Sequence, residues 1–190
     1  PTQASVADLA SACPTIEQII FSRFSYKMLQ DMPLSWFQPF TKLTHAVNEL
    51  GRPISSAQEI AETLNACPRL TSLSLLAEGP LVFDVAQHLL KSFEQLHKLQ
   101  LQDSILTTDC SIALMQACCN LTTLNVWNAT VEDGQMNEIV CASPQLRELE
   151  VGGDESGICD ADVVAICNKQ TSLVKLRMAN IDGLTDASVS

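Results

Sequence analysis

Apolar residues recur along the chain in a short motif, L-x-x-L-x-L, whose last two apolar positions alternate with polar ones. A longer version, C-P-x-L-x-x-L-x-L, begins at Cys13 and again at Cys67. The first apolar position of each copy, here called the anchor, is Ile16, Leu43, Leu70, Leu96, Leu121, Leu146 or Leu173. The anchors are 25–27 residues apart, and self-similarity at a fixed period of this size indicates a repeat architecture.

The spacing of apolar residues within each repeat predicts one strand and one helix. Period-2 apolar positions after the anchor predict a short strand. Before the anchor, spacings such as Ala57, Ile60, Ala61 and Leu64 follow the i, i+3, i+4, i+7 rule of a helix of about three turns. Seven residues before the anchors lie Leu9, Trp36, Thr63, Leu89, Leu114, Ile139 and Ile166. Six residues before lie Ala10, Phe37, Leu64, Leu90, Met115, Val140 and Cys167, and both columns are predicted to face the core.

Two further columns follow the same register. Aspartates 12 or 13 residues before an anchor mark predicted helix starts, where a carboxylate opposes the positive end of the helix dipole; they are Asp31, Asp84, Asp109, Asp133 and Asp160. Asp186 opens what would be a further helix. Three residues before the anchors lie Cys13, Phe40, Cys67, Phe93, Cys118, Ser143 and Gln170. This column predicts a stacked ladder at the corner between helix and strand.

The pattern resembles the leucine-rich repeat, specifically its cysteine-containing subclass, over about residues 5–190. Leu184-Thr185-Asp186 matches the I-T-D element of that subclass, and Cys13-Pro14 and Cys67-Pro68 match its C-P element. Thr107-Thr108-Asp109 and Ile158-Cys159-Asp160 match I-T-D more loosely. The chain departs from the family after the strand, where the usual Cys or Asn is replaced by Ser104, Ala129, Asp154 and Ile181.

The resemblance implies an α/β fold: a single leucine-rich repeat domain over residues 1–190, shaped as a right-handed horseshoe of about seven repeats. Parallel strands would line the concave face and helices the convex face. Neither end shows a polar cap, so we expect a segment of a longer protein, or end-to-end contacts through the uncapped terminal repeats. Cysteine-type repeats are typical of F-box substrate receptors of ubiquitin ligases and their relatives. The F-box-like stretch at 32–37 is interpreted as helix core, because its register places Trp36 and Phe37 there.

Composition narrows the classes of partner. The 190 residues are 46% apolar and 5% aromatic, which predicts a sizeable aliphatic core. A net charge of −11 argues against nucleic acid or an anionic membrane surface as partner, because both attract basic patches. No apolar run approaches the ~20 residues that span a bilayer. The eight cysteines form no C-x-x-C pair, so they predict buried, reduced thiols in a cytoplasmic or nuclear protein and neither a zinc site nor a cofactor.

Strand alternation selects the residues that face the concave side. We predict a partner-binding site there at Gln100, Gln102, Asn125, Trp127, Glu148, Glu150, Lys175 and Arg177. Trp127 either contributes to a binding hot spot, where tryptophan is enriched, or folds over a neighbouring loop. The charged residues either form solvated cross-strand ion pairs or a charged rim that orients a partner.

Catalysis finds little support in the sequence. His45, His88 and His97 lie in different repeats, and no G-x-S-x-G, P-loop, G-x-G-x-x-G or H-E-x-x-H motif occurs. The leading hypothesis is therefore a non-catalytic scaffold that binds a protein on its concave face. The alternative is the substrate-recognition part of an F-box-type ubiquitin ligase whose box lies outside this segment. An enzyme that uses a thiol is a third hypothesis.

Overall fold

The computed structural model describes residues 3–21, 37–48, 57–80, 87–128, 130–131, 136–153 and 157–186. Its helices are α1 (Gln3–Ala12), α2 (Ala57–Ala66), the 3₁₀ helix η2 (Gln87–Gln95), α3 (Thr108–Ala117), α4 (Met136–Cys141) and α5 (Asp160–Lys169). Its strands are β1 (Gln18–Phe21), β2 (His45–Asn48), β3 (Ser72–Pro80), β4 (Lys98–Leu106), β5 (Thr123–Trp127), β6 (Thr130–Val131), β7 (Glu148–Gly152) and β8 (Lys175–Ala179).

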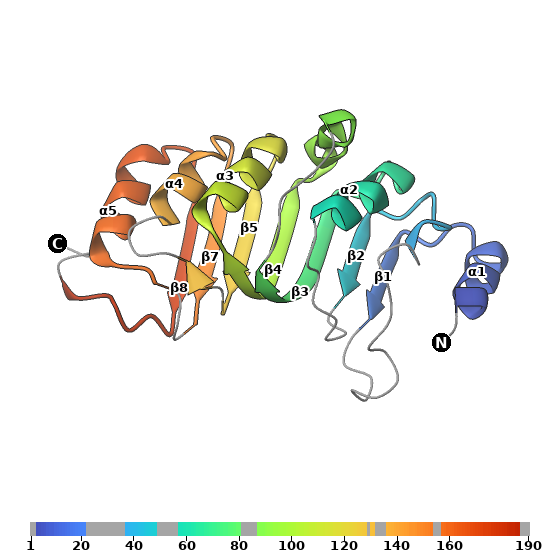
Figure 1. The fold of residues 1–190 in the computed structure, drawn as a ribbon, viewed down its shortest axis with the longest axis horizontal. Coiled ribbons are helices and arrows are strands. Elements are labelled where there is room, and N and C mark those ends of the chain that lie inside the picture. Colours follow the sequence, from blue (N-terminus) through green and yellow to red (C-terminus); the bar gives the residue numbers. More distant parts are fainter. Residues whose placement is uncertain are drawn as a thin grey trace.

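The strands form one parallel sheet in the order β1-β2-β3-β4-β5-β7-β8, and the short β6 pairs with β4. Helices α2 to α5 lie along one side of this sheet (Figure 1). The pairing keeps equal positions of neighbouring repeats opposite each other, as in the row Lys98, Thr123, Glu148 and Lys175. The predicted alternation of strand and helix in an α/β solenoid is therefore confirmed.

The anchors form the spine of the core. Leu43, Leu70, Leu96, Leu121 and Leu146 have no exposed surface. Ile16 and Leu173 are partly buried and pack against the same cluster. Burying apolar area contributes roughly 25 cal/mol per Å², so a column of stacked leucines accounts for the fixed spacing of the motif.

Backbone hydrogen bonds tie each repeat to the next where the strands begin. The carbonyl of Thr122 accepts from the N–H groups of both Arg147 (2.8 Å) and Glu148 (3.0 Å). The carbonyl of Arg147 accepts in the same way from Val174 and Lys175. The equivalent carbonyls of Glu17, Thr44, Thr71 and His97 repeat this arrangement. Because every strand start is bonded to its neighbour, the register of the sheet is fixed at this edge.

The predicted corner ladder is confirmed at six of its seven positions: Phe40, Cys67, Phe93, Cys118, Ser143 and Gln170 are buried. Gln170 satisfies its amide there, because its Nε2 donates to the carbonyl of Val140 at 2.8 Å. The seventh member, Cys13, is exposed, in contrast to the prediction. It belongs to the first described repeat, which has a described neighbour on one side only.

The prediction that the thiols are buried holds only in part. Cys67 and Cys118 are buried, and burial raises their pKa values from 9.0 to about 11 and about 12. Cys13, Cys119 and Cys167 are exposed, and Cys141 and Cys159 are half-buried. Cys119 and Cys167 each follow a buried residue, Cys118 and Ile166, and this neighbour takes the inward position. The side chain of Cys110 lies outside the described residues.

Helices differ from the prediction in two repeats. The segment before Leu96 forms a 3₁₀ helix with three residues per turn, and Phe93 within it is buried. Helix α4 has six residues, shorter than the expected three turns. In the core-facing columns, Phe37 is buried as predicted, but Leu9 and Cys167 are exposed. Trp36 and the side chain of Leu89 lie outside the described residues.

Acidic residues begin the helices at two of the predicted places. Asp109 and Asp160 lie in the first turns of α3 and α5, whereas Asp31, Asp84 and Asp133 lie outside the described residues. The sequence missed Asp162, which is fully buried and closes a capping box with Cys159. Its carboxylate also accepts from the backbone N–H of Asn137 at 3.3 Å. Asp162 therefore connects α5 to α4.

Residues with a left-handed backbone lie toward the ends of four strands. Asp103 lies within β4, whereas Asn128, Gly153 and Asn180 directly follow β5, β7 and β8, and their φ angles are 52°, 53°, 117° and 56°. Each lies one residue before the position where the family places Cys or Asn. Asn, Asp and Gly are the residues that adopt this left-handed conformation at least cost. The Nδ2 of Asn128 donates to the carboxylate of Asp103 at 3.0 Å, so neighbouring turns are hydrogen-bonded.

Candidate functional site

The predicted binding residues come together on the sheet face turned away from the helices, called here the concave face. They lie on the adjacent strands β4, β5, β7 and β8. One row pairs Gln100, Asn125, Glu150 and Arg177 in register. The rows on either side contain Lys98, Thr123, Glu148 and Lys175, and Gln102, Trp127, Gly152 and Ala179. Strand alternation therefore assigned all eight residues to one continuous surface, called here the β4–β8 surface.

Two cross-strand ion pairs connect β7 to β8, which is one of the two alternatives that the sequence left open. Arg177 donates to the carboxylate of Glu150 at 2.7 Å, and Glu150 is only 22% exposed. Lys175 lies 3.9 Å from Glu148, and these side chains are 59% and 49% exposed. The first pair is a charge-assisted hydrogen bond, whereas the second is at the limit of contact and screened by water. Glu150 is therefore held in place more firmly than Glu148.

Trp127 lies across the neighbouring strand at Gly152. A Cβ atom added to Gly152 would lie 2.7 Å from Cζ3 of the Trp127 ring, closer than real Cβ contacts. The indole can lie there only because the register partner on β7 has no side chain. Trp127 remains partly exposed on the concave face. It forms an aromatic platform, because packing over Gly152 holds its ring in place before any partner binds.

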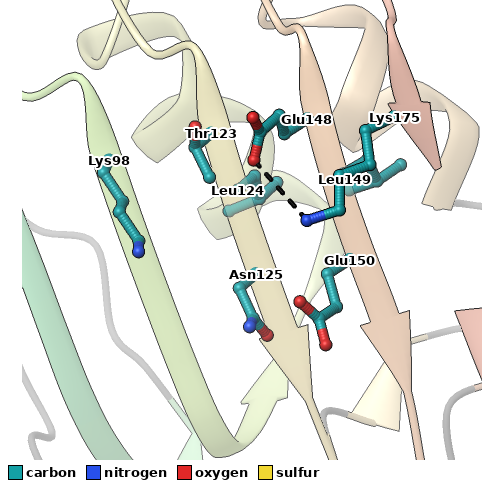
Figure 2. A pocket seen from close by; sticks show the side chains of 8 residues that line it. All are labelled: Lys98, Thr123, Leu124, Asn125, Glu148, Leu149, Glu150 and Lys175. Carbon is teal, nitrogen blue, oxygen red and sulfur yellow. Dashed lines mark ion pairs between the residues drawn. The ribbon is translucent and has the colours of Figure 1, made fainter. Parts of the chain in front are cut away.

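A hollow of about 90 Å³ lies beside this platform. Figure 2 shows its lining, which is Lys98, Thr123, Leu124, Asn125, Glu148, Leu149, Glu150 and Lys175. The Oδ1 atom of Asn125 is buried there and has no hydrogen-bond partner. An unsatisfied buried acceptor costs about 1–3 kcal/mol, so this oxygen is a place where a donor would bind favourably.

Sequence reasoning missed part of this site. Lys98 and Thr123 line the hollow, although neither is among the predicted binding residues. The spacing alone could have indicated Gly152, because it is six residues after its anchor, as Trp127 is after Leu121. The sequence could not indicate the unpaired Oδ1 atom of Asn125, because its lack of a donor depends on how the side-chain amide is oriented in the fold.

A wider hollow of about 600 Å³ lies at the edge where β7 and β8 begin. Pro144, Gln145, Arg147 and Ser172 line it, and it is open to solvent. None of the predicted site residues belongs to it. We therefore place the candidate site on the β4–β8 surface.

The described histidines are engaged locally. Nδ1 of His45 lies 2.8 Å from Oγ1 of Thr44, and Nδ1 of His97 lies 2.9 Å from the carbonyl of Gln95. Within the described ranges, no three side chains of His, Cys, Asp or Glu are grouped to hold a metal ion. The same part of the chain contains no helix long and apolar enough to cross a membrane. The site offers charged groups, amides and an aromatic ring to a binding partner.

Comparisons with known proteins agree with the architecture. No family model and no curated protein matches the chain. An internalin (inlF) from Listeria monocytogenes is 18% identical, with a TM-score of 0.54 over 93% of this chain and 44% of that one. Internalin C2 from the same organism is 15% identical, with a TM-score of 0.41 over 94% of this chain and 84% of that one.

A TLR13–ssRNA13 complex gives 12% identity and a TM-score of 0.34, over 90% of this chain and 34% of TLR13. The chain thus spans less than half the length of the inlF and TLR13 chains. Internalins are leucine-rich repeat proteins, and the TM-score to inlF together with the parallel sheet establishes the architecture. The chain has the fold of an α/β leucine-rich repeat solenoid.

Proposed function

We propose that this chain is a non-catalytic scaffold that binds a protein partner through the β4–β8 surface. The observation that carries the proposal is the position of Trp127, held across Gly152 and partly exposed beside two cross-strand ion pairs. Binding hot spots are enriched in Trp and Arg, and charged neighbours set the orientation and the association rate of a partner.

The dimensions of the surface favour a protein over a small molecule. Pockets for small ligands usually enclose about 300–1,000 Å³, whereas the hollow between β4 and β7 has about 90 Å³. Four parallel strands with mixed charges and amides offer an extended contact area. The net charge of −11 disfavours nucleic acid as the partner, because phosphate contacts require clustered Lys and Arg.

The test begins with the partner recovered from the native source with this chain as bait. The dissociation constant of the purified pair is then measured for the parent chain, Trp127→Ala and the control Ser72→Ala on β3. Loss of a hot-spot tryptophan costs about 2 kcal/mol or more, so Trp127→Ala should weaken binding about 30-fold. Ser72→Ala should bind like the parent.

A Trp127→Ala protein that binds as tightly as the parent would remove the proposed site. Circular dichroism of both variants establishes that the fold is retained before affinities are compared. Ubiquitin-ligase subunits recovered with the bait would identify the chain as a substrate receptor. Recovery of a partner without them would favour a scaffold outside that pathway.

A further inference from the structure

We propose that the hollow between β4, β5 and β7 receives the guanidinium group of an arginine side chain from the protein partner. The inference rests on the proposed function and deepens it, because it names the chemical group that the β4–β8 surface recognises. It is carried by the acceptor groups of the hollow, its size, and the aromatic platform beside it.

The floor of the hollow presents hydrogen-bond acceptors that face one another. Asn125 and Glu150 are register partners on β5 and β7, and both line the hollow. In Figure 2 the carbonyl oxygen of Asn125 lies beside the carboxylate of Glu150. That carbonyl oxygen is buried without a donor. Arg177 already donates to Glu150 at 2.7 Å, so a further group with several N–H donors between the two side chains would satisfy the amide oxygen and share the carboxylate with Arg177.

A guanidinium fits this arrangement. A volume of about 90 Å³ corresponds to roughly three waters in the liquid, enough for one small planar head group. Guanidinium carries its N–H donors in a fixed fork that matches carboxylates and amide oxygens, whereas an ammonium is a point charge. The Glu148 carboxylate also lines the hollow and is held only by a 3.9 Å contact with Lys175. An exposed pair of this kind is worth ~0–1 kcal/mol, so a guest can replace Lys175.

An aromatic side chain, Trp127, lies on the same surface, although it is not one of the residues that line the hollow. It lies two residues after Asn125 on the same face of β5, and its ring lies across β7 at Gly152. Arginine stacks on tryptophan more often than lysine does, through cation–π attraction. The net charge of −11 raises the encounter rate with a cationic partner segment.

Lys98 provides a test of the sign of the guest. It lines the hollow from β4 and makes no ion pair within the described residues. A cationic guest is repelled by Lys98, whereas an anionic guest is attracted to it. Lys98→Ala should therefore tighten binding of an arginine side chain about twofold to fivefold, as expected for removal of one exposed charge contact.

The experiment titrates the chain with blocked pentapeptides, Gly-Gly-X-Gly-Gly, and follows backbone amide shifts by NMR. X is arginine, lysine, uncharged citrulline or glutamate. We expect the arginine peptide to shift Asn125 and Glu150 with a Kd on the order of 1 mM, and the other peptides to bind at least several-fold more weakly. Asn125→Ala should weaken the arginine peptide, and Lys98→Ala should tighten it. Ser72→Ala on β3 should leave the titration unchanged.

Four results would overturn the inference. One is no shift with the arginine peptide at concentrations of tens of mM. A second is a glutamate peptide that shifts the same amides and loses affinity in Lys98→Ala, which would assign the hollow to a carboxylate. A third is a lysine or citrulline peptide that binds as tightly as arginine. A fourth is an Asn125→Ala protein with the parent's affinity.

These outcomes are separable from those of the proposed function. If Trp127→Ala no longer binds the partner but the arginine peptide causes no amide shifts, the proposed binding surface is retained and the arginine assignment is rejected. If the arginine peptide binds but Trp127→Ala keeps full affinity for the partner, the proposed function falls.

Discussion

The two halves of the concave face share one frame, which is the parallel strand register with its buried leucines. They differ in the side chains at their concave positions. Strands β1 to β3 present mostly small or neutral side chains there, namely Gln18, Ile20, His45, Ser72 and Ser74. Strands β4 to β8 present charges, amides and an indole. Both halves keep the same parallel register and the same buried leucines, such as Leu73 and Leu124. The repeat thus fixes the frame and leaves the concave positions free to vary.

This difference assigns stability and binding to separate residues. Strand leucines that face the helices are buried in both halves, such as Leu73 on β3 and Leu124 on β5, so both halves need them. The concave residues of β4 to β8 are half-buried or exposed, apart from Gly152 and Gly153, and they interact across strands. Their particular chemistry is not needed for the fold, because β1 to β3 form the same sheet without it (Figure 1). The binding that we propose therefore involves the variable positions of the second half.

The largest expected effect concerns the shared frame. Leu73→Ala on β3 and Leu124→Ala on β5 should each lower the free energy of unfolding by about 2–5 kcal/mol, because each leaves a cavity in the core. Urea denaturation followed by circular dichroism gives both values. A loss below ~1 kcal/mol in only one of them would break the equivalence of the two halves.

A smaller loss is expected from the turn that follows β7. Gly153 has φ of +117°, and a Cβ there would lie 2.7 Å from Cα of Asn128. Gly153→Ala should lower the free energy of unfolding by about 1–3 kcal/mol through backbone strain. A Gly153→Ala protein as stable as the parent would contradict this account of the turn ladder.

Alkaline pH should weaken both halves by a similar amount. Cys67 precedes β3 and Cys118 precedes β5, and burial raises their pKa values to about 11 and about 12. Above pH 9 the unfolded chain loses these protons while the folded chain keeps them, so stability falls as pH rises. Each thiol should cost on the order of 1 kcal/mol by pH 10. The decline between pH 9 and 11 should become shallower in Cys67→Ala/Cys118→Ala, and an unchanged slope would contradict the assignment.

The smallest effect on stability is expected on the β4–β8 surface. Arg177→Ala removes an exposed partner of Glu150 and should change the free energy of unfolding by ~0–1 kcal/mol. The same change should weaken partner binding clearly, because it releases Glu150 from its orientation. Thermal unfolding and an affinity measurement on one preparation compare the two effects. A stability loss above ~2 kcal/mol would mean that the ion pair supports the frame.

The sequence predicts the frame well because the same spacing of apolar residues recurs in every repeat. The anchors, the strand register and the corner column follow from periodicity, and Phe93 and Cys118 are buried as that register requires. Local geometry was harder to predict. Whether a segment becomes a 3₁₀ helix, as before Leu96, depends on how it packs against its neighbours.

The candidate site could be predicted as a set of residues but not as an arrangement. Alternation alone assigned Trp127 and Glu150 to one face, and the structure agrees. That the indole lies across Gly152 depends on two repeats at once, which no single motif contains. The exposed thiols were missed for a similar reason. The column that contains Cys118 faces inward. The turn that directs Cys119 outward does not recur at a fixed spacing, so no pattern predicts it.

The most direct test is hydroxyl-radical footprinting of the chain with and without its partner, read residue by residue by mass spectrometry. Trp127 on β5 and His45 on β2 are both accessible and oxidisable, and they represent the two halves of the concave face. We predict that the partner sharply reduces oxidation of Trp127 and leaves that of His45 unchanged. Protection of His45 with Trp127 still oxidised at the free rate would contradict it.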